Sequence, residues 1–574
     1  MKTKALYLTV VLGMMLGFSS CNLDTFPSDE LNTDLLLQDP KGAEYIMDGC
    51  YSLLKEQVEF LGYQDGNTYI RHYTQMAEFP GDNICLCASS TDPLYEVTAL
   101  TTNDGLKNIG TLWMVGYKAI YMCNTVISTL KEDDPDGKQL LGEAYFMRGL
   151  LHLHLVTLYA KPYAFGRDNL GIPLRTSTSS EVTVRNPVGE VYDQIVADLR
   201  KGADLMGKSR GNAGYPCKET ALGVLSRVYL YMGMNDECIA AVDEALAGAT
   251  PESKLEPNGT FATYFINAKT SIETLFCVAH EITDDRKGSS IGSMYNADGG
   301  GWGEIYPSDP LLNLYQRYPT DVRLTGFIDP QYKASSTRTI GYFVDPVTIP
   351  SPAGTTRHMP LAVLTAKPDG SYTFVEDGTT YTVENRKVNG EGKADPAGEY
   401  CEYHVNYKGV DCAVMVSPEI NLNSKGTTFP NIYMYKYSYQ DGNAMLSSPV
   451  LCRWAELILN RAEAYAKNGQ DAKALDDVNV IRTRAGIPAE GLFSTGNMHG
   501  YSNALNVVLD ERRMELAFEG HRVFDVYRNK LKMDRQYPGA HPWRIVDPET
   551  EDHIIFPIPN NEWTVSHIPQ NPGY

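Results

Sequence analysis

Two amphipathic segments near the C-terminus give the clearest pattern of hydrophobic and polar positions. Over 453–465, apolar residues recur at helical spacing on one face: Trp454, Ile458, Ala462 and Tyr465. Asn468-Gly469 supplies a helix stop, and the same spacing resumes over 474–481. Small residues stand where the two segments would cross, at Ala462, Ala464 and Ala474. The pattern predicts two antiparallel helices joined by a short turn.

The same pattern occurs a second time upstream. Tyr229 and Gly233 are followed by Cys238, Val242 and Ala245, with the gaps that separate Tyr465, Gly469, Ala474, Val478 and Ile481. A paired helix of this kind buries its apolar face only against stacked neighbours. The two copies therefore predict a tetratricopeptide-like scaffold interrupted by a large insertion. Two unrelated amphipathic hairpins are the alternative explanation.

The rest of the chain divides by composition into helical and irregular parts. Helical spacing covers 43–56, 106–130, 138–158, 188–206, 218–232 and 237–246. Between 249 and 447 the composition shifts towards Gly, Pro, Thr and Tyr, with short alternating runs at 371–375 and 380–383. The predicted fold is mainly α, with a large irregular, partly β insertion. The expected parts are 1–20 as a signal peptide, 21–248 as a helical scaffold with a surface loop at 62–104, 249–447 as the insertion, and 448–574 as the helical remainder of the same domain.

The N-terminus has the pattern of a lipoprotein signal. Lys2 and Lys4 precede an apolar run over 5–18 that is too short to span a bilayer as an anchor. Small residues then lead to Cys21, whose thiol would be acylated. A plain signal peptide is the alternative. Ten further cysteines lie downstream. Four of them, Cys50, Cys123, Cys238 and Cys452, stand in helical patterns, and we expect mostly free or structural thiols. Cys401 with Cys412 is the pair that merits a check for a disulfide.

Charge and local motifs exclude several classes of function. The formal net charge of −21 argues against a nucleic-acid partner, which requires basic patches. His152 and His154 are two apart on a helix and face different ways, so no metal site is predicted. Glu511, Glu515 and Glu519 form a carboxylate row, but Arg512, Arg513 and Arg522 interleave with it as on a charge-balanced helix. Arg512 shares an apolar stripe, so we expect it to be buried and paired with Glu456 or Glu463.

Several runs resemble the SusD/RagB family of outer-membrane nutrient-uptake lipoproteins. The resemblance rests on five runs, which are 453–456, 479–486, 511–522, 556–562 and 570–574. It implies a protein that captures oligosaccharides at the cell surface and passes them to a SusC-like TonB-dependent transporter. The family also implies a lid over that transporter, tethered to the outer membrane through the lipid on Cys21. No cofactor and no catalytic residue are implied.

Two aromatic-rich excursions, 63–95 and 294–306, match the residue types that bind sugars. Aromatic planes meet the C–H face of a sugar ring, while Asp, Asn and Arg bind its hydroxyl rim. The chain holds 37 tyrosines against 17 phenylalanines, which suits such recognition. By resemblance, the candidate ligand residues are Arg71, Tyr73, Asp82, Asn83, Tyr95, Tyr295, Trp302 and Tyr306. A peptide-capturing member of the same family and a surface glycoside hydrolase with two carboxylates remain the alternatives.

Overall fold

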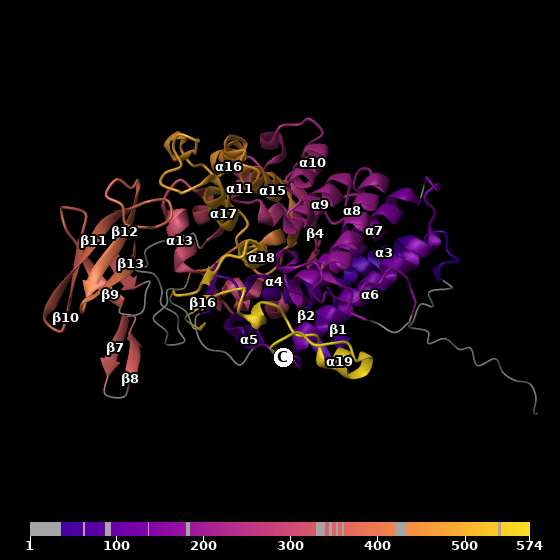
Figure 1. Cartoon of the computed structure of the whole chain (residues 1–574), viewed down its shortest axis with the longest axis horizontal. Coiled ribbons are helices and arrows are strands. Elements are labelled where there is room, and N and C mark those ends of the chain that lie inside the picture. Colours follow the sequence, from indigo (N-terminus) through magenta and orange to yellow (C-terminus); the bar gives the residue numbers. More distant parts are fainter. Residues whose placement is uncertain are drawn as a thin grey trace, which may run out of the picture.

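The computed structural model describes residues 36–60, 63–86, 93–135, 137–179, 184–328, 339–343, 347–351, 354–358, 361–418, 432–537, 541–542 and 544–574. These residues form an extended helical body with a small β lobe at one end (Figure 1). Within this part of the chain, every helix falls short of the length and apolarity that crossing a membrane requires.

The N-terminal half of the body is a row of helices that pack on one another in sequence order. They are α3 (Gly42–Leu53), α6 (Lys107–Thr129), α7 (Lys138–Tyr159), α8 (Val188–Leu205), α9 (Lys218–Met232) and α10 (Asn235–Leu246). From α6 to α10, each helix contacts the next, and α3 packs on α6. All six follow the helical periodicity of the sequence, with end points that differ from it by up to three residues.

The two predicted hairpins form and stack directly on each other. The second hairpin consists of α15 (Trp454–Lys467) and α16 (Asp471–Arg484), and α10 of the first packs against α15. Each hairpin turns at a glycine in the left-handed region, Gly233 with φ +76° and Gly469 with φ +69°. The prediction of one helical scaffold interrupted by an insertion is confirmed. The remaining C-terminal helices are α17 (Ala504–Glu515), α18 (Arg522–Arg528) and α19 (Asn560–Ser566).

The insertion is more regular than the sequence indicated. Six antiparallel strands close into a small barrel in the order β10-β11-β12-β13-β6-β9. Their bounds are β6 (Thr339–Phe343), β9 (Leu361–Ala366), β10 (Tyr372–Glu376), β11 (Thr379–Val388), β12 (Tyr400–Tyr407) and β13 (Val410–Pro418). A hairpin of β7 (Val347–Ser351) and β8 (Gly354–His358) extends beside it (Figure 1). The barrel has its own apolar core, to which β9, β10, β11, β12 and β13 contribute buried side chains.

The prediction of a surface loop over 62–104 is wrong for most of its length. This stretch contains β2 (Tyr63–Thr68), α4 (Tyr69–Glu78), β3 (Ile84–Leu86) and α5 (Pro93–Ala99), and every residue of α4 is buried. Apolar residues do recur at helical spacing in α4, at Ile70, Tyr73 and Ala77, but polar residues occupy its other faces, and these are buried as well. Polar side chains of α4 such as Arg71 and Glu78 form hydrogen bonds with distant segments of the chain. Their polarity therefore suggested a solvent-exposed segment although they are buried.

The remaining elements are short. They are β1 (Gln57–Phe60), β4 (Thr274–Cys277), α11 (Asn258–Phe261), α12 (Gly292–Tyr295), β5 (Ile305–Pro307), α13 (Asp309–Gln316), α14 (Val322–Phe327), β14 (Val450–Arg453), β15 (Met533–Asp534) and β16 (Ile545–Val546). Strand β4 pairs with β14, and this pairing joins segments of the chain that lie before and after the barrel strands.

Cys401 and Cys412 both carry free thiols. The register pairs Cys412 with Val405, four positions along β12 from Cys401. Four residues of strand span about 13 Å, which is too far for a disulfide. Among the described residues, the other cysteines are free as well, and most are buried. Cys21 lies outside the described residues.

Candidate functional site

The two aromatic-rich excursions of the sequence lie side by side. Strand β3 pairs with β5, which places Cys85 opposite Tyr306. Beyond the strands, the Ser308 N–H donates to the Asn83 carbonyl at 2.9 Å, and the Ser308 hydroxyl donates to the Asp82 carbonyl at 2.6 Å. The chain therefore brings 63–95 and 294–306 together, although most of the predicted side chains point inward.

Four of the candidate tyrosines are packing residues in this structure. Tyr295 and Tyr306 are 0% and 2% exposed, and the Tyr295 ring packs against Phe79, Tyr437 and Phe518. The Tyr73 ring stacks on His154 with 3.9 Å between ring centroids. Tyr95 is half-buried against the main core. Tyr73, Tyr295 and Tyr306 therefore do not offer their ring faces to solvent, and Tyr95 is only partly exposed.

Asp82 and Asn83 are buried and bound to arginines of the C-terminal scaffold. The Arg522 guanidinium donates to both Asp82 carboxylate oxygens, at 2.7 and 2.9 Å. The Arg513 Nε donates to the Asn83 side-chain oxygen at 2.9 Å. Burial would raise the pKa of the Asp82 carboxyl, but Arg513 and Arg522 outweigh it and hold this pKa well below its usual range. Asp82 is therefore a charged structural link between the β3 region and α18.

Arg71 and Trp302 share one carbonyl oxygen. The buried Arg71 Nη1 donates to the Gly288 and Ser290 carbonyls at 2.9 and 3.0 Å. The Trp302 indole Nε1 donates to the same Gly288 carbonyl at 2.8 Å. Of the eight predicted side chains, Trp302 alone is mostly exposed, at 58%. Arg71 thus fixes the turn that orients an exposed indole.

Three tyrosines that sequence reasoning missed lie in the segment that contacts the Trp302 loop. The α-carbon of Gly303 sits so close to the Tyr433 ring that a Cβ there would lie 3.0 Å from Cε1. Tyr435 and Tyr439 both donate their hydroxyls to the Asp298 carboxylate. We call Trp302, Asp298, Tyr433, Tyr435 and Tyr439 the aromatic platform. The alternation of tyrosines from 433 to 439 is the signal that could have found them.

The aromatic platform is suited to binding without bond-breaking chemistry. Tyr439 is 37% exposed, and Tyr433 and Tyr435 are partly exposed, so ring faces and phenol groups are within reach of a ligand. Asp298 supplies a carboxylate acceptor between two phenols. Among the described residues, no group of three or more His, Cys, Asp or Glu side chains could hold a metal ion.

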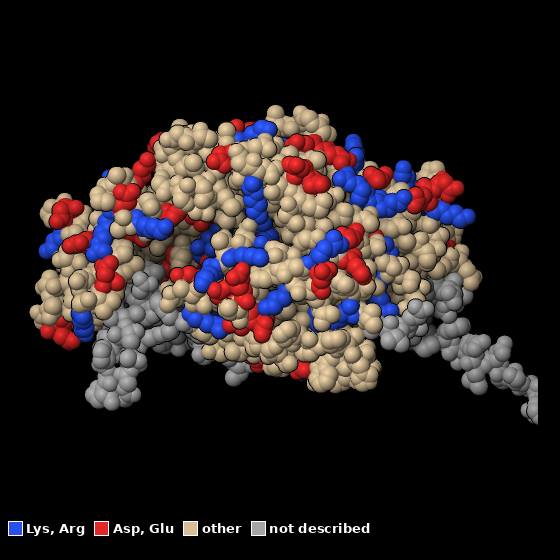
Figure 2. All heavy atoms as spheres, in the orientation of Figure 1, with Lys and Arg blue, Asp and Glu red and all other residues tan. Residues whose placement is uncertain are grey.

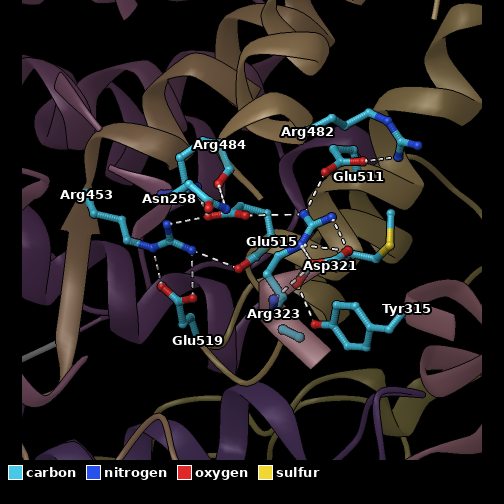
Figure 3. Close-up of polar contacts among 12 residues, drawn as sticks. Asn258, Tyr315, Asp321, Arg323, Arg453, Arg482, Arg484, Glu511, Glu515 and Glu519 are labelled. Carbon is cyan, nitrogen blue, oxygen red and sulfur yellow. Dashed lines mark hydrogen bonds and ion pairs between the residues drawn. The ribbon is translucent and has the colours of Figure 1, made fainter. Parts of the chain in front are cut away.

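The carboxylate row of α17 is buried in an ion-pair network, as Figure 3 shows. Glu515 accepts from Arg453 at 2.6 Å, from Arg323 at 3.3 Å and from Arg484. Glu511 accepts from Arg323 and Arg482 at 2.6 and 2.9 Å. The structural interpretation of the row is confirmed, but its partners come from distant segments and are not the interleaved Arg512, Arg513 and Arg522. These carboxylates are unavailable for acid–base catalysis.

Arg512 is buried, and its strongest partner is one that the sequence did not indicate. Its Nε lies 2.9 Å from the Asp525 carboxylate and 3.4 Å from the Glu463 carboxylate. The pairing with Glu463 is confirmed as the weaker of the two contacts. Glu456 instead binds Arg227 at 2.6 Å, which joins the two stacked hairpins through their centre.

Glu78 is a buried carboxyl whose titration affects stability. It accepts backbone N–H bonds from Phe518 at 3.3 Å and Gly520 at 2.9 Å. Burial raises the pKa of Glu78 to about 7, against the opposing effect of these bonds. The native state therefore binds a proton more tightly than the unfolded chain, so stability falls as pH rises from about 4.5 to about 7.

We expect Glu78→Gln to flatten this pH dependence, because glutamine mimics the protonated carboxyl. Urea unfolding at pH 5, 6, 7 and 8 measures the effect. Between pH 5 and pH 8 we expect the free energy of unfolding to fall by about 2 kcal/mol more in wild type than in Glu78→Gln. Glu44→Gln, on the exposed part of α3, is the control and should keep the wild-type profile. Parallel profiles for wild type and Glu78→Gln would contradict the prediction.

Charged side chains give the face shown in Figure 2 a mixed character. Lysine and arginine are interspersed with aspartate and glutamate over the helical body and the barrel, and no single basic patch forms on this face (Figure 2). Charges of both signs are therefore mixed over this face, on a chain whose formal net charge is −21.

Comparison with known proteins assigns most of the chain to one group. A family model described as "SusD family" matches residues 273–574, and another described as "Starch-binding associating with outer membrane" matches residues 60–230. SusD-like protein P2 of Formosa agariphila is 24% identical over 511 residues, which cover 83% of each chain. SusD-like protein P38 of the same organism is 20% identical over 593 residues, covering 100% of this chain and 98% of that protein.

Solved structures share the fold. A SusD superfamily protein from Bacteroides thetaiotaomicron superposes with a TM-score of 0.68 at 20% identity, covering 94% of this chain and 100% of the other. A SusD-like carbohydrate binding protein from Bacteroides vulgatus superposes with a TM-score of 0.64 at 17% identity, covering 92% and 96%. At these identities the likeness is one of fold.

Proposed function

The chain belongs to the SusD family, and from this premise we propose that it binds oligosaccharides at the cell surface and delivers them to a SusC-like TonB-dependent outer-membrane transporter. The family model over 60–230 carries the description "Starch-binding associating with outer membrane", and one structural neighbour is described as a carbohydrate binding protein. Both descriptions support saccharide as the ligand class.

The observation that carries this proposal is the exposed, oriented indole of Trp302. An indole held by a hydrogen bond to a turn that the buried Arg71 also holds is preorganised, so binding does not require it to be ordered. Its flat apolar face suits the C–H face of a sugar ring. The Asp298 carboxylate, four residues away along the same loop, and the two phenols that donate to it suit the hydroxyl rim. Tyr295 and Tyr306 act from beneath, as the floor on which these loops rest.

We expect Trp302→Ala to weaken oligosaccharide binding by roughly 2 kcal/mol, or about thirtyfold, because an exposed aromatic anchor is lost. Isothermal titration calorimetry of the chain from residue 22 measures this, after a screen of starch, maltooligosaccharides and other soluble polysaccharides has identified a ligand. Tyr45→Ala is the matched control, since this tyrosine is 48% exposed on α3 away from the platform. Equal affinities for wild type and Trp302→Ala would overturn the platform as the binding site.

The same screen separates the alternative functions. Release of reducing ends from a bound polysaccharide would indicate a hydrolase and contradict pure binding. Binding of a peptide library with no binding of any polysaccharide would favour the peptide-capturing function. The buried, arginine-paired carboxylates of α17 support binding over hydrolysis.

The membrane anchor and the transporter belong to the proposal. Cys21 stands after the apolar run of a lipoprotein signal, and acylation there would leave the chain tethered to the outer membrane. Mass spectrometry of the N-terminal peptide tests this, because a free thiol on Cys21 would contradict it. The SusC-like partner rests on the family resemblance, and purification of the transporter without this chain would count against it.

A further inference from the structure

A cavity of about 350 Å³ lies against helix α6 and shares no lining residue with the aromatic platform. One wall is a row of aromatic residues spaced one helical turn apart, Trp113, Tyr117 and Tyr121. Trp113 is 3% exposed and Tyr121 is 50% exposed, so the row runs from the interior to the surface. Eight residues of helix span about 12 Å, so the row offers a long apolar strip.

The opposite wall is the segment 173–179, which buried side chains hold in place. The Asn124 side-chain amide donates to the Arg175 and Ser177 carbonyls at 3.2 and 3.0 Å. Arg148 donates to the Thr176 carbonyl at 3.2 Å, and the Arg175 N–H donates to His152 Nε2 at 3.2 Å. Four hydrogen bonds from the buried faces of α6 and α7 therefore fix a segment with no helical or strand structure of its own.

The third wall is α19, which is fixed as firmly. The Asn560 N–H and the Trp563 indole N–H both donate to Asp104, at 2.9 and 2.8 Å. This contact sets Glu562 in the cavity lining together with Arg175. Burial raises the pKa of the Glu562 carboxyl, although Trp113 and Arg175 oppose the shift. A ligand hydroxyl that donates to this carboxylate would replace part of the hydration that burial has removed.

The lining has the balance of groups that a neutral, hydroxylated ligand requires. One guanidinium and one carboxylate offset each other in charge, so the cavity has no net attraction for an ion. The hydroxyl side chains of 177–179 add donors and acceptors at the rim. The volume falls in the range of small-molecule sites, and preformed walls lower the ordering cost of binding.

We propose that this cavity is a second saccharide site, which takes one or two sugar rings with their apolar faces on Tyr117 and Tyr121 and their hydroxyls on Arg175 and Glu562. The choice of saccharide as the ligand rests on the proposed function, whereas the location of the site rests on the cavity itself. A chain with two separate sugar sites can hold two ends of one polysaccharide, or two chains, and so gains avidity for long glycans.

Saturation-transfer NMR of the chain from residue 22 tests the second site. The probes are D-glucose, D-galactose, D-mannose, D-xylose, L-fucose, N-acetyl-D-glucosamine and maltose, each at millimolar concentration. We expect Tyr121→Ala and Glu562→Gln to weaken binding of at least one probe about tenfold. We expect Trp302→Ala to leave that binding in place. Tyr121 is half exposed, so its removal does not endanger the fold, and Tyr45→Ala is the matched control.

The possible outcomes separate this inference from the proposed function. If every probe binds equally to wild type and Tyr121→Ala, or if no probe binds, the second site is wrong. If oligosaccharide binding is lost in Trp302→Ala alone, the platform stands and the second site falls. If sugar binding depends on Tyr121 and not on Trp302, the second site stands and the platform falls.

Discussion

Glu515→Gln is expected to lower the free energy of unfolding by roughly 3–5 kcal/mol. The Glu515 carboxylate is fully buried and joins Arg323, Arg453 and Arg484, which come from three separate parts of the chain (Figure 3). A glutamine keeps the volume but removes the charge, so a buried excess of positive charge remains. Replacing both partners of a buried ion pair with apolar residues often changes stability little. Removing only one partner is strongly destabilising, because the other charge stays buried without compensation.

Urea unfolding monitored by circular dichroism at pH 7 measures the effect. Asp411→Asn is the control, because Asp411 and its partner Arg386 form an exposed pair, at 53% and 34% side-chain exposure. Its loss should change stability by less than about 1 kcal/mol. Similar losses in the two variants would show that burial does not set the strength of the network.

The same carboxyl predicts a loss of stability in acid. Burial would raise the pKa of Glu515, but Arg484, Arg453 and Arg323 outweigh it and lower this pKa far below its ordinary value of 4.5. A group with a lowered native pKa contributes full stability above its unfolded pKa and loses it as pH falls below that value. The Glu515→Gln variant should therefore lose less stability than wild type between pH 5 and pH 3.

Asp82→Asn is expected to have the second large effect, again roughly 3–5 kcal/mol of destabilisation. Asp82 accepts two hydrogen bonds from Arg522 and lies 3.4 Å from Arg513, and it is 4% exposed. The substitution leaves two buried guanidinium groups facing a neutral amide. The contact between the β3 region and α18 should weaken as a result.

Thermal unfolding together with oligosaccharide titration separates the two roles of Asp82. Asp193→Asn is the control, since its pair with Arg167 is more than half exposed on both sides. If Asp82 is a structural residue, the variant melts earlier but binds oligosaccharide normally at temperatures where it is folded. Lost affinity with an unchanged melting temperature would instead make Asp82 a ligand residue.

The aromatic platform shows where sequence reasoning about the site reached its limit. Trp302 lies among glycines in the sequence, and its indole is 58% exposed. Tyr433, Tyr435 and Tyr439 were missed, since their association with the Trp302 loop links segments more than 130 residues apart. The same distance separates Tyr295 from Tyr437, whose stacking buries a ring that its sequence context would place near the surface.

The sequence by itself determined the long scaffold helices and the paired hairpins, because helical periodicity and the turn glycines Gly233 and Gly469 are local properties of the chain. The tertiary structure alone decided which arginine meets which carboxylate and which aromatic ring meets solvent. Exposure and ion pairing depend on whatever segment packs against a residue, and in this fold that segment is often hundreds of residues away. Arg453 finds Glu273 and Glu515 in this way, and so an acidic row that looks balanced by its own neighbours is neutralised by others.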